Sequence, residues 1–414
     1  MRTAILAFAL LLALAASAFA EQEQPLAYRT SASTIEGEED YVGITSGQKL
    51  ATQDKPPDGV ALPKFTGEKP LFGLWKISMG KLTGPAARDK GLWLALDCSD
   101  KAGRYDLLYV DANGNGSLAD EKPIRAERAR NADGFVLSDF SMIRILLPGQ
   151  DGPITRHISL LFRRPPGSPD MLLARCRGWY EGTITIAGRK FTCCVIDNNA
   201  NGRFGDQSRE MDQCDRYILL PHTAGKKPQP TLEQLYLFVG RYVRVDGEYY
   251  SMEIAPGGAT VEFTPAKVST GTIKPGEGVS SMLVRSPVGT FEVEVRNGVV
   301  EVPEGEYIDY CCIVTRKDEK GNTWRARGVV KGKDKPLVVR AGLETKINVG
   351  EPFIYSLSVS SAEQGLYRIT QSLLTSREDG IQLTCNNDSR RPKPKLRITN
   401  AEKTYDHTFT MEYG

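Results

Sequence analysis

Two short polar segments of this sequence place oxygen-bearing side chains at alternate positions directly after an apolar run. The first reads DANGNGSLAD (111–120) after LLYV, and the second reads DNNANGRFGD (197–206) after TCCVI. Both fit the pattern D-x-N-x-N-G-x-[LF]-x-D, and a Gly-Arg pair precedes each apolar run. The matching positions are Asp111, Asn113, Asn115, Gly116, Leu118 and Asp120 in the first loop, and Asp197, Asn199, Asn201, Gly202, Phe204 and Asp206 in the second. One strand-plus-loop unit is therefore used twice.

The spacing of these residues suits a calcium ion. Calcium takes six to eight oxygen ligands at about 2.3–2.6 Å. Side-chain oxygens at positions 1, 3 and 5, a backbone carbonyl at position 7 and a glycine at position 6 let one loop wrap around such an ion. The predicted ligands are Asp111, Asn113, Asn115, Ser117 (by its carbonyl) and Asp120, and in the second loop Asp197, Asn199, Asn201, Arg203 (by its carbonyl) and Asp206.

The pattern resembles the calcium loops of the EF-hand and dockerin families, over about a dozen residues at each site. It departs from them at position 12, where the EF-hand has a bidentate Glu and this chain has Lys122 or Ser208. The segment before each loop also has the composition of a strand. A further carboxylate is therefore expected, and its candidates are Glu121, Glu210, Asp212 and Asp215. Two matched carboxylates in each loop predict weak binding, in the range of about 10⁻⁴–10⁻³ M that is typical of extracellular modules.

Two other interpretations of the loops remain open. Asn, Asp and Gly are common turn residues, so the loops could simply reverse the chain. In addition, Gly114, Gly116 and Ala119 spell G-x-G-x-x-A after a strand, which is the pattern of dinucleotide-binding loops. The second copy has Ala200 in place of the first glycine, and no long amphipathic helix follows either loop. The repetition therefore favours the metal site.

The sequence contains no recognisable catalytic motif, since neither HExxH nor G-x-S-x-G is present. The three histidines are His157, His222 and His407. A carboxylate pair needs no local spacing, so Asp97, Asp212 and Asp215 leave open a secreted hydrolase acting on a polysaccharide. The leading interpretation is an exported, non-enzymatic, calcium-binding protein with a structural or surface-binding role.

The first twenty residues predict export. Arg2 precedes an apolar stretch that ends in ASAFA, so we expect a signal peptide cleaved before Glu21 and a secreted, periplasmic or cell-surface protein. The net charge of +2 gives no reason to expect a nucleic acid partner. No later segment is apolar enough to insert into a membrane. The partner is expected to be a surface ligand or a protein whose identity the sequence does not indicate, and it does not indicate the oligomeric state.

The eight cysteines include no CxxC pair, which indicates neither a thioredoxin-type site nor a zinc knuckle. They are predicted to be mainly buried free thiols. A disulfide between Cys193 or Cys194 and Cys176 or Cys214 remains an alternative.

Short runs rich in β-branched and aromatic residues, bounded by Gly, Pro, Asn or Asp, predict an all-β, multi-domain chain of antiparallel sandwiches and meanders with few short helices. One short helix is expected within 231–242 and one strand near Tyr41–Ile44. The segment VPEGEY (302–307) resembles the carboxypeptidase-regulatory-like β modules, which favours a sandwich.

The predicted parts are a signal peptide (1–20), an extended N-terminal arm (21–64), a β domain with both calcium loops (65–222), a β meander or sandwich (231–345) and an immunoglobulin-like β domain (346–414).

Overall fold

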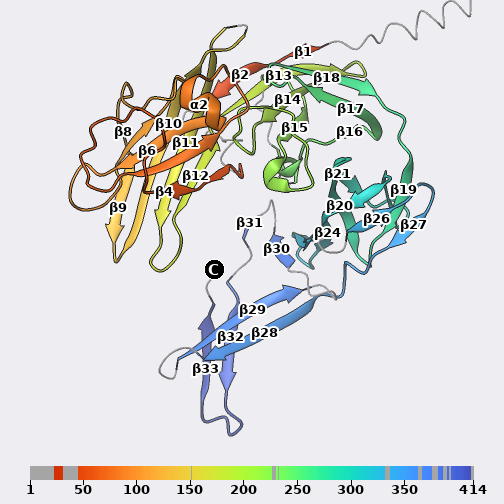
Figure 1. Cartoon of the computed structure of the whole chain (residues 1–414). Helices are drawn as coiled ribbons and strands as arrows, with labels where there is room; N and C mark the ends of the chain where they lie inside the picture. Colours follow the sequence, from red (N-terminus) through yellow and green to blue (C-terminus); the bar gives the residue numbers. More distant parts are fainter. Residues whose placement is uncertain are drawn as a thin grey trace, which may run out of the picture. The chain divides into compact units, whose positions relative to one another are not determined.

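The computed structural model describes most of the chain. The described residues are 23–30, 45–150, 152–225, 230–231, 233–331, 336–361, 366–374, 381–385, 389–390 and 393–411. The predicted signal peptide and the predicted strand at Tyr41–Ile44 lie outside them. In the described ranges the chain forms many sheets that are almost all antiparallel, which confirms the all-β prediction (Figure 1).

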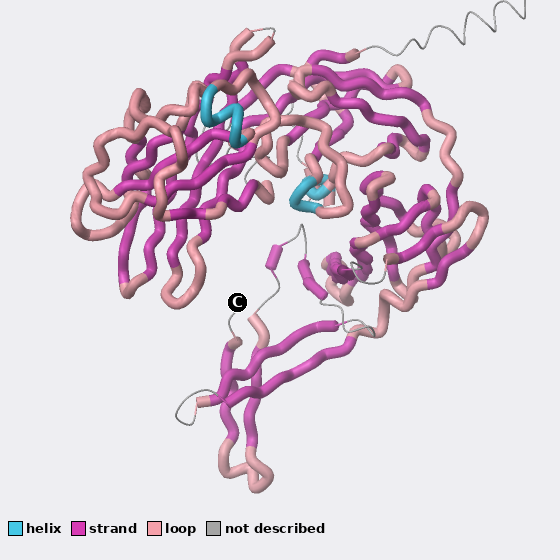
Figure 2. The backbone as a smooth tube through the Cα atoms, in the orientation of Figure 1, coloured by secondary structure: helices cyan, strands magenta, loops and turns pink. Residues whose placement is uncertain are grey.

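Helices are few and short, as Figure 2 shows. The α-helix α2 (Gly84–Asp89) has Pro85 in its first turn and closes at Lys90, whose φ of 55° is left-handed. The 3₁₀ turns are η1 (Met211–Gln213) and η2 (Gln234–Tyr236), and η2 stands where a short helix was predicted. Of the helices in the described ranges, none has the length and hydropathy that a membrane crossing requires.

The chain divides into two compact units. The first comprises residues 1–267 and 287–290, and the second comprises 268–286 and 291–414. The sequence instead predicted domain boundaries at 223–230 and after residue 345. The boundary falls later because the strands at 242–265 form a sheet with β1 (Gln24–Pro25), near the N-terminus.

Two five-stranded sheets form a sandwich in the first unit. Their strand orders are β4-β5-β6-β7-β8 and β3-β12-β11-β10-β9. The strands are β3 (Gln48–Leu50), β4 (Thr52–Gln53), β5 (Leu71–Lys76), β6 (Gly91–Asp97), β7 (Leu107–Val110), β8 (Ile124–Arg125), β9 (Arg128–Ala132), β10 (Phe135–Leu147), β11 (Ile154–Arg164) and β12 (Met171–Cys176). One core lies between the sheets and includes Trp75, Leu94, Phe140 and Phe162.

The sheet that contains β5, β6 and β7 is buried on both faces. Its second face packs Phe72, Trp93 and Tyr109 against Val60 and Leu118. Double burial explains why these strands read as continuous apolar runs instead of alternating ones. It also ties Leu118, the apolar residue of the first loop, to the core.

Two four-stranded sheets complete the first unit, with the orders β15-β14-β13-β2 and β1-β18-β17-β16. Their remaining strands are β2 (Ala27–Thr30), β13 (Gly178–Ile186), β14 (Arg189–Ile196), β15 (Arg216–Pro221), β16 (Tyr242–Val245), β17 (Glu248–Ile254) and β18 (Thr260–Pro265). The N-terminal arm was predicted to be merely extended, but four of its segments, β1 to β4, are paired strands. Each joins the edge of a sheet formed by later residues.

The second unit contains one six-stranded sheet, β21-β20-β24-β25-β30-β31, and four smaller ones, with the orders β22-β19-β27, β23-β26, β28-β29 and β32-β33. The strands are β19 (Thr270–Lys274), β20 (Val279–Ser286), β21 (Gly289–Glu294), β22 (Val300–Pro303), β23 (Gly305–Tyr307), β24 (Asp309–Lys317), β25 (Thr323–Lys331), β26 (Leu337–Val339), β27 (Glu344–Lys346), β28 (Ile354–Ser361), β29 (Tyr367–Leu374), β30 (Ile381–Cys385), β31 (Ser389–Arg390), β32 (Lys395–Thr399) and β33 (Asp406–Thr410). Because β30 pairs with β25, two strands of the segment 346–414, β30 and β31, share a sheet with the preceding block. The immunoglobulin-like arrangement of this segment stays a prediction.

The seven cysteines whose side chains are described are free thiols. Cys98 is half-buried, and the others are buried: Cys176, Cys193, Cys194, Cys214, Cys311 and Cys312. The alternative of a disulfide among Cys176, Cys193, Cys194 and Cys214 is therefore not realised. Burial raises the pKa of the Cys176 and Cys193 thiols to about 12, so these groups behave as small apolar residues.

Truncation of Leu94 tests the sandwich core. Leu94 is almost fully buried between the two five-stranded sheets. We expect Leu94→Ala to lower the free energy of unfolding of the first unit by about 2–5 kcal/mol, since the substitution leaves a cavity. The matched control is Leu146→Ala on β10, where the side chain is 42% exposed and the expected loss is under about 1 kcal/mol. Urea denaturation followed by tryptophan fluorescence measures both, and equal losses would contradict the assigned core.

Candidate metal site

Each repeated loop begins at the residue that follows a buried strand. Asp111 follows β7 and Asp197 follows β14, and their exposed fractions are 0% and 2%. In both loops the first Asp accepts two backbone N–H groups from the turn. The Asp111 carboxylate bonds to the N–H of Asn115 (3.1 Å) and of Gly116 (2.9 Å). The carboxylate of Asp197 bonds to the N–H of Asn201 (3.2 Å) and Gly202 (2.8 Å).

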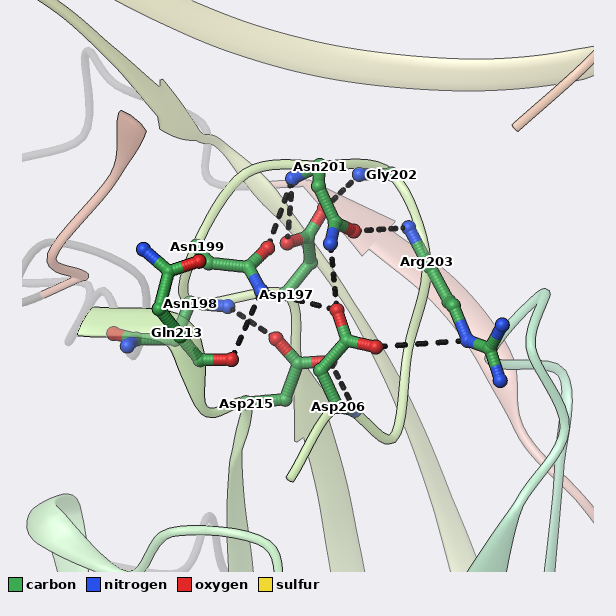
Figure 3. A network of polar contacts seen from close by, with 9 residues as sticks. All are labelled: Asp197, Asn198, Asn199, Asn201, Gly202, Arg203, Asp206, Gln213 and Asp215. Carbon is green, nitrogen blue, oxygen red and sulfur yellow. Dashed lines mark hydrogen bonds and ion pairs between the residues drawn. The ribbon is translucent and has the colours of Figure 1, made fainter. Parts of the chain in front are cut away.

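The Asp at position 10 gathers the two Asn side chains of its loop. In the first loop the amide nitrogens of Asn113 and Asn115 donate to Oδ2 of Asp120, at 3.2 and 2.9 Å. In the second loop the matching Asn side chains donate to Oδ2 of Asp206, at 3.0 and 2.6 Å, as Figure 3 shows. The predicted side chains of each loop thus converge, and the two loops have the same hydrogen-bond pattern.

The Asn carbonyl oxygens keep capacity for a further ligand. Oδ1 of Asn113 accepts the N–H of Asn115 at 3.0 Å, and Oδ1 of Asn115 accepts the N–H of Ser117 at 2.8 Å. A carbonyl oxygen has two lone pairs, so each of these atoms can also coordinate a cation. In the second loop, Oδ1 of Asn199 and of Asn201 accept in the same way.

The residues at position 7 differ between the loops in a way that affects charge. The side chain of Ser117 hydrogen-bonds to Asp120. Arg203, in contrast, places its Nε 3.5 Å from Oδ1 of Asp206, and the two form an ion pair at the protein surface (Figure 3). Arg203 therefore competes with any cation for the Asp206 carboxylate.

Two of the four candidate additional carboxylates belong to the loops. Oε1 of Glu121 accepts the N–H of Ala112 at 2.9 Å, and Oδ1 of Asp215 accepts the N–H of Asn198 at 3.0 Å. Both N–H groups belong to position 2, so Glu121 and Asp215 have equivalent roles. Oδ2 of Asp215 also accepts the N–H of Asp206.

The other two candidates, Glu210 and Asp212, are exposed. The sequence could not distinguish these two from Asp215, because the chain between the second loop and β15 is irregular.

Three carboxylates of the loops are buried, those of Asp111, Asp197 and Asp215, and the positive charge of Arg156 acts on Asp197. Burial raises the pKa of Asp111, and it raises that of Asp197 to about 7. Burial also raises the pKa of Asp215, which lies close to the Asp197 charge. Among the described residues, no Lys or Arg forms an ion pair with Asp111 or Asp197. Burying such anions is costly, and a bound cation would offset that cost.

Asp120 differs from these buried groups because it lies at the surface. Hydrogen bonds from the side chains of Ser117 and Asn115 lower the pKa of Asp120 to about 2. It therefore stays ionised over the whole physiological pH range, as a calcium ligand must.

In the described part of the chain, no three His, Cys, Asp or Glu side chains gather as a metal cluster. A cation in these loops would consequently depend on amide and backbone oxygens as well as on carboxylates. Oxygen-only coordination with few charged ligands selects a hard cation such as calcium over a transition metal.

Contacts with the sandwich fix the second loop in place, and the sequence did not reveal them. The indole N–H of Trp75 donates to the carbonyl of Ala200 at 2.6 Å. The N–H of Ser78 donates to the carbonyl of Asn201, and that of Gly47 to the carbonyl of Asn198, both at 2.8 Å. These bonds join residues more than a hundred positions apart, so no local pattern could predict them.

Arg156 is a second feature that the sequence did not indicate. Its guanidinium is almost fully buried and lies 5.2 Å from the ring centre of Phe204, the apolar residue of the second loop. It also lies over the rings of Tyr28 and Tyr180, at 5.6 Å from each, and donates to the carbonyl of Gly257. The cation–π contact between Arg156 and Phe204 thus stabilises the second loop.

The acidic residues considered for catalysis have structural roles in the described chain. The carboxylate of Asp97 accepts the N–H groups of Thr66 and Gly67, at 2.8 and 2.9 Å. Asp215 belongs to the second loop, and Asp212 is exposed beside it. The histidines also have ordinary neighbours, because His157 stacks on Tyr28 and His407 packs against Phe409.

Comparison of the chain with protein-family models, with curated proteins and with solved structures finds no match. The chemistry of the two loops is therefore what indicates a function. That chemistry is specific, because the same contacts occur at two separate places in one unit.

Substitution of the loop glycines tests the local geometry. Gly116 and Gly202 have φ of 79° and 83°, a region that favours glycine. A Cβ at Gly116 would meet the backbone N of Pro85 at 2.9 Å, whereas one at Gly202 would meet only the flexible side chain of Met79. We expect Gly116→Ala to lower the free energy of unfolding by more than about 2 kcal/mol, and Gly202→Ala by less.

Gly188 provides the matched control, because its φ is 77° and nothing lies within 4 Å of an added Cβ. Gly188→Ala should cost only the conformational strain of about 1 kcal/mol. Denaturant unfolding of the three variants measures the order, and a loss at Gly116 no larger than at Gly188 would contradict the described packing of the first loop.

Proposed function

We propose that this chain is an exported calcium-binding β protein with a structural or surface-binding role, and that each of the two loops binds one calcium ion. The observation that carries the proposal is that two Asn side chains and an Asp gather beside a buried carboxylate in both loops, at Asp111 and at Asp197, and that neither carboxylate forms an ion pair with Lys or Arg among the described residues. Export is supported by the signal-like residues 1–20, and weak loops of this kind suit a compartment with millimolar calcium.

The residues that would hold the ions follow from the contacts. In the first loop they are Asp111, Asn113, Asn115, Asp120 and the carbonyl of Ser117, and in the second Asp197, Asn199, Asn201, Asp206 and the carbonyl of Arg203. Glu121 and Asp215 orient the loops through the N–H at position 2 and bring additional negative charge. When bound, calcium supplies positive charge beside buried anions and binds only the folded loops. Calcium at about five times Kd would therefore stabilise the unit by about 1 kcal/mol per site.

A structural role agrees with the position of the loops. The first loop is joined to segment 60–62 by the bond from the N–H of Leu118 to the carbonyl of Ala61 at 2.8 Å. The second is joined to β5 through Trp75 and to the residue before β3 through Gly47. Holding these loops rigid would therefore hold separate strands of the unit together. The alternative of a carboxylate-dependent hydrolase has no comparable support.

Calcium titration of variants with isosteric loop substitutions tests the proposal. Asp111→Asn and Asp197→Asn each remove one buried charge while keeping the shape of the side chain. We expect the wild type to bind two calcium ions with Kd of about 10⁻⁴–10⁻³ M, each single variant one ion, and the double variant none. Calorimetry measures the stoichiometry, and the shift of the unfolding midpoint with calcium provides a second readout.

The control for this titration is Asp133→Asn, at an exposed turn of the same unit. It removes the same charge and should leave both sites intact. Circular dichroism checks that the variants fold. Identical calcium heats and identical midpoint shifts in all five proteins would refute the metal site.

An exchange of the position 7 residues tests the electrostatic difference between the loops. Arg203→Ser removes the cation that pairs with Asp206, so we expect calcium to bind the second loop several-fold more tightly, about threefold to tenfold. Ser117→Arg should weaken the first loop by a similar factor. Each variant is measured by calorimetry in a protein that also carries the Asp→Asn substitution of the other loop, so that only one calcium site remains. Affinities that do not respond to either exchange would show that no cation lies near position 7.

A further inference from the structure

A cleft of about 1030 Å³ lies beside the second loop in the first unit. One part of its wall is formed by residues of β3, the end of β5 and the start of β6, and another by the second loop and the turn η1. This volume is at the upper end of the range for ligand sites in proteins, about 300–1,000 Å³. The cleft is therefore large enough for a ligand of several sugar rings.

Three lysines from separate segments line this cleft: Lys49, Lys76 and Lys90. The strand register brings the last two together, because Lys76 of β5 pairs with Gly91, the residue after Lys90. The side chain of Gln48 binds the backbone of Lys76 twice, through its Nε2 at 2.9 Å and its Oε1 at 3.0 Å, which draws the neighbouring Lys49 to the same place.

The lysines are exposed, and none of the three has an acidic partner among the described residues. The cleft contains one acidic side chain, Asp212. The lining residues carry three positive charges and one negative charge, so the lining has a net positive charge although the whole chain is nearly neutral. Unpaired cations that gather in a concave site attract anions from solution.

The rest of the lining can bind hydroxyl groups and is held rigidly. Gln53, Ser78 and Gln213 place amide and hydroxyl groups along the cleft. The backbone bonds from Gly47 and Ser78 to the second loop fix one wall against the other. The backbone of the two walls is therefore already in place before a ligand binds, and the binding cost falls on the exposed side chains.

We propose that this cleft binds an anionic oligosaccharide, whose carboxylate or sulfate groups pair with Lys49, Lys76 and Lys90. The amide and hydroxyl groups of the lining bond to the sugar hydroxyls. Trp93, the aromatic residue of the cleft, is only 8% exposed, so it offers no platform on which nucleic acid bases could stack. The inference goes beyond calcium binding, because the lysines are positive whether or not the loops hold an ion.

Calorimetric titration of the full chain with defined tetrasaccharides tests the inference. The probes are tetragalacturonate for carboxylates, a heparin tetrasaccharide for sulfates, cellotetraose as the neutral sugar and a tetrathymidylate as the nucleic acid. We expect at least one acidic tetrasaccharide to bind, and the preferred one identifies the anionic group. We expect cellotetraose and tetrathymidylate to bind more weakly than it. Measurements with and without calcium separate this outcome from that of the calcium proposal.

A pair of triple variants tests the assigned residues. Lys49→Gln, Lys76→Gln and Lys90→Gln together should weaken binding of the acidic tetrasaccharide by about tenfold or more. The matched control combines Lys101→Gln, Lys122→Gln and Lys190→Gln, which removes the same charge from exposed positions of the unit outside the cleft. This control should weaken binding by less than about threefold.

Three results would overturn the inference. They are a failure of both acidic tetrasaccharides to bind, an equal loss of affinity in the two triple variants, and tighter binding of tetrathymidylate than of either acidic sugar. All six lysines are exposed, so the variants should fold, and circular dichroism confirms this before titration.

Discussion

Two carboxylates buried at the ends of strands fix the conformation of the two repeated loops. Asp111 and Asp197 each follow the last residue of a strand, and their side chains point inward. Each carboxylate accepts two backbone N–H groups of the turn that follows. These hydrogen bonds hold the turns closed but do not neutralise the charge. A buried anion needs a proton, a basic side chain or a cation. In the described chain neither group forms an ion pair with Lys or Arg, although the charge of Arg156 acts on Asp197.

The two loops have the same internal contacts but are attached to the protein differently. In the first loop the apolar residue Leu118 packs against one of the two buried faces of the sheet that contains β5, β6 and β7. The second rests on Phe204 above the guanidinium of Arg156, and its backbone carbonyls accept from Trp75 and Ser78. The common contacts are made by the residues of the repeated pattern, and the differing contacts are those that each location in the fold allows. This division supports the view that the loop is the functional element.

The sequence predicted the features that depend on local pattern. The all-β class followed from short branched and aromatic runs, and the two loops from a spacing that occurs twice. It did not predict features that depend on distant contacts. The N-terminal arm read as loosely extended because its strands are only two to four residues long and are stabilised by partners such as β18 and β12. The unit boundary after Lys267, the choice of Asp215 over Asp212, and the position of Arg156 depend on the same long-range pairing.

Calcium binding by the loops is tested most directly by anomalous X-ray diffraction from crystals grown with calcium, recorded at a long wavelength where calcium scatters anomalously. Two peaks are expected, one in each loop, with oxygens of Asp111 or Asp197 and of the neighbouring Asn side chains at about 2.3–2.6 Å. Well-ordered loops with no peak, in which the Asn amides still donate to Asp120 and Asp206, would contradict it. The loops would then be turns that close on their own hydrogen bonds.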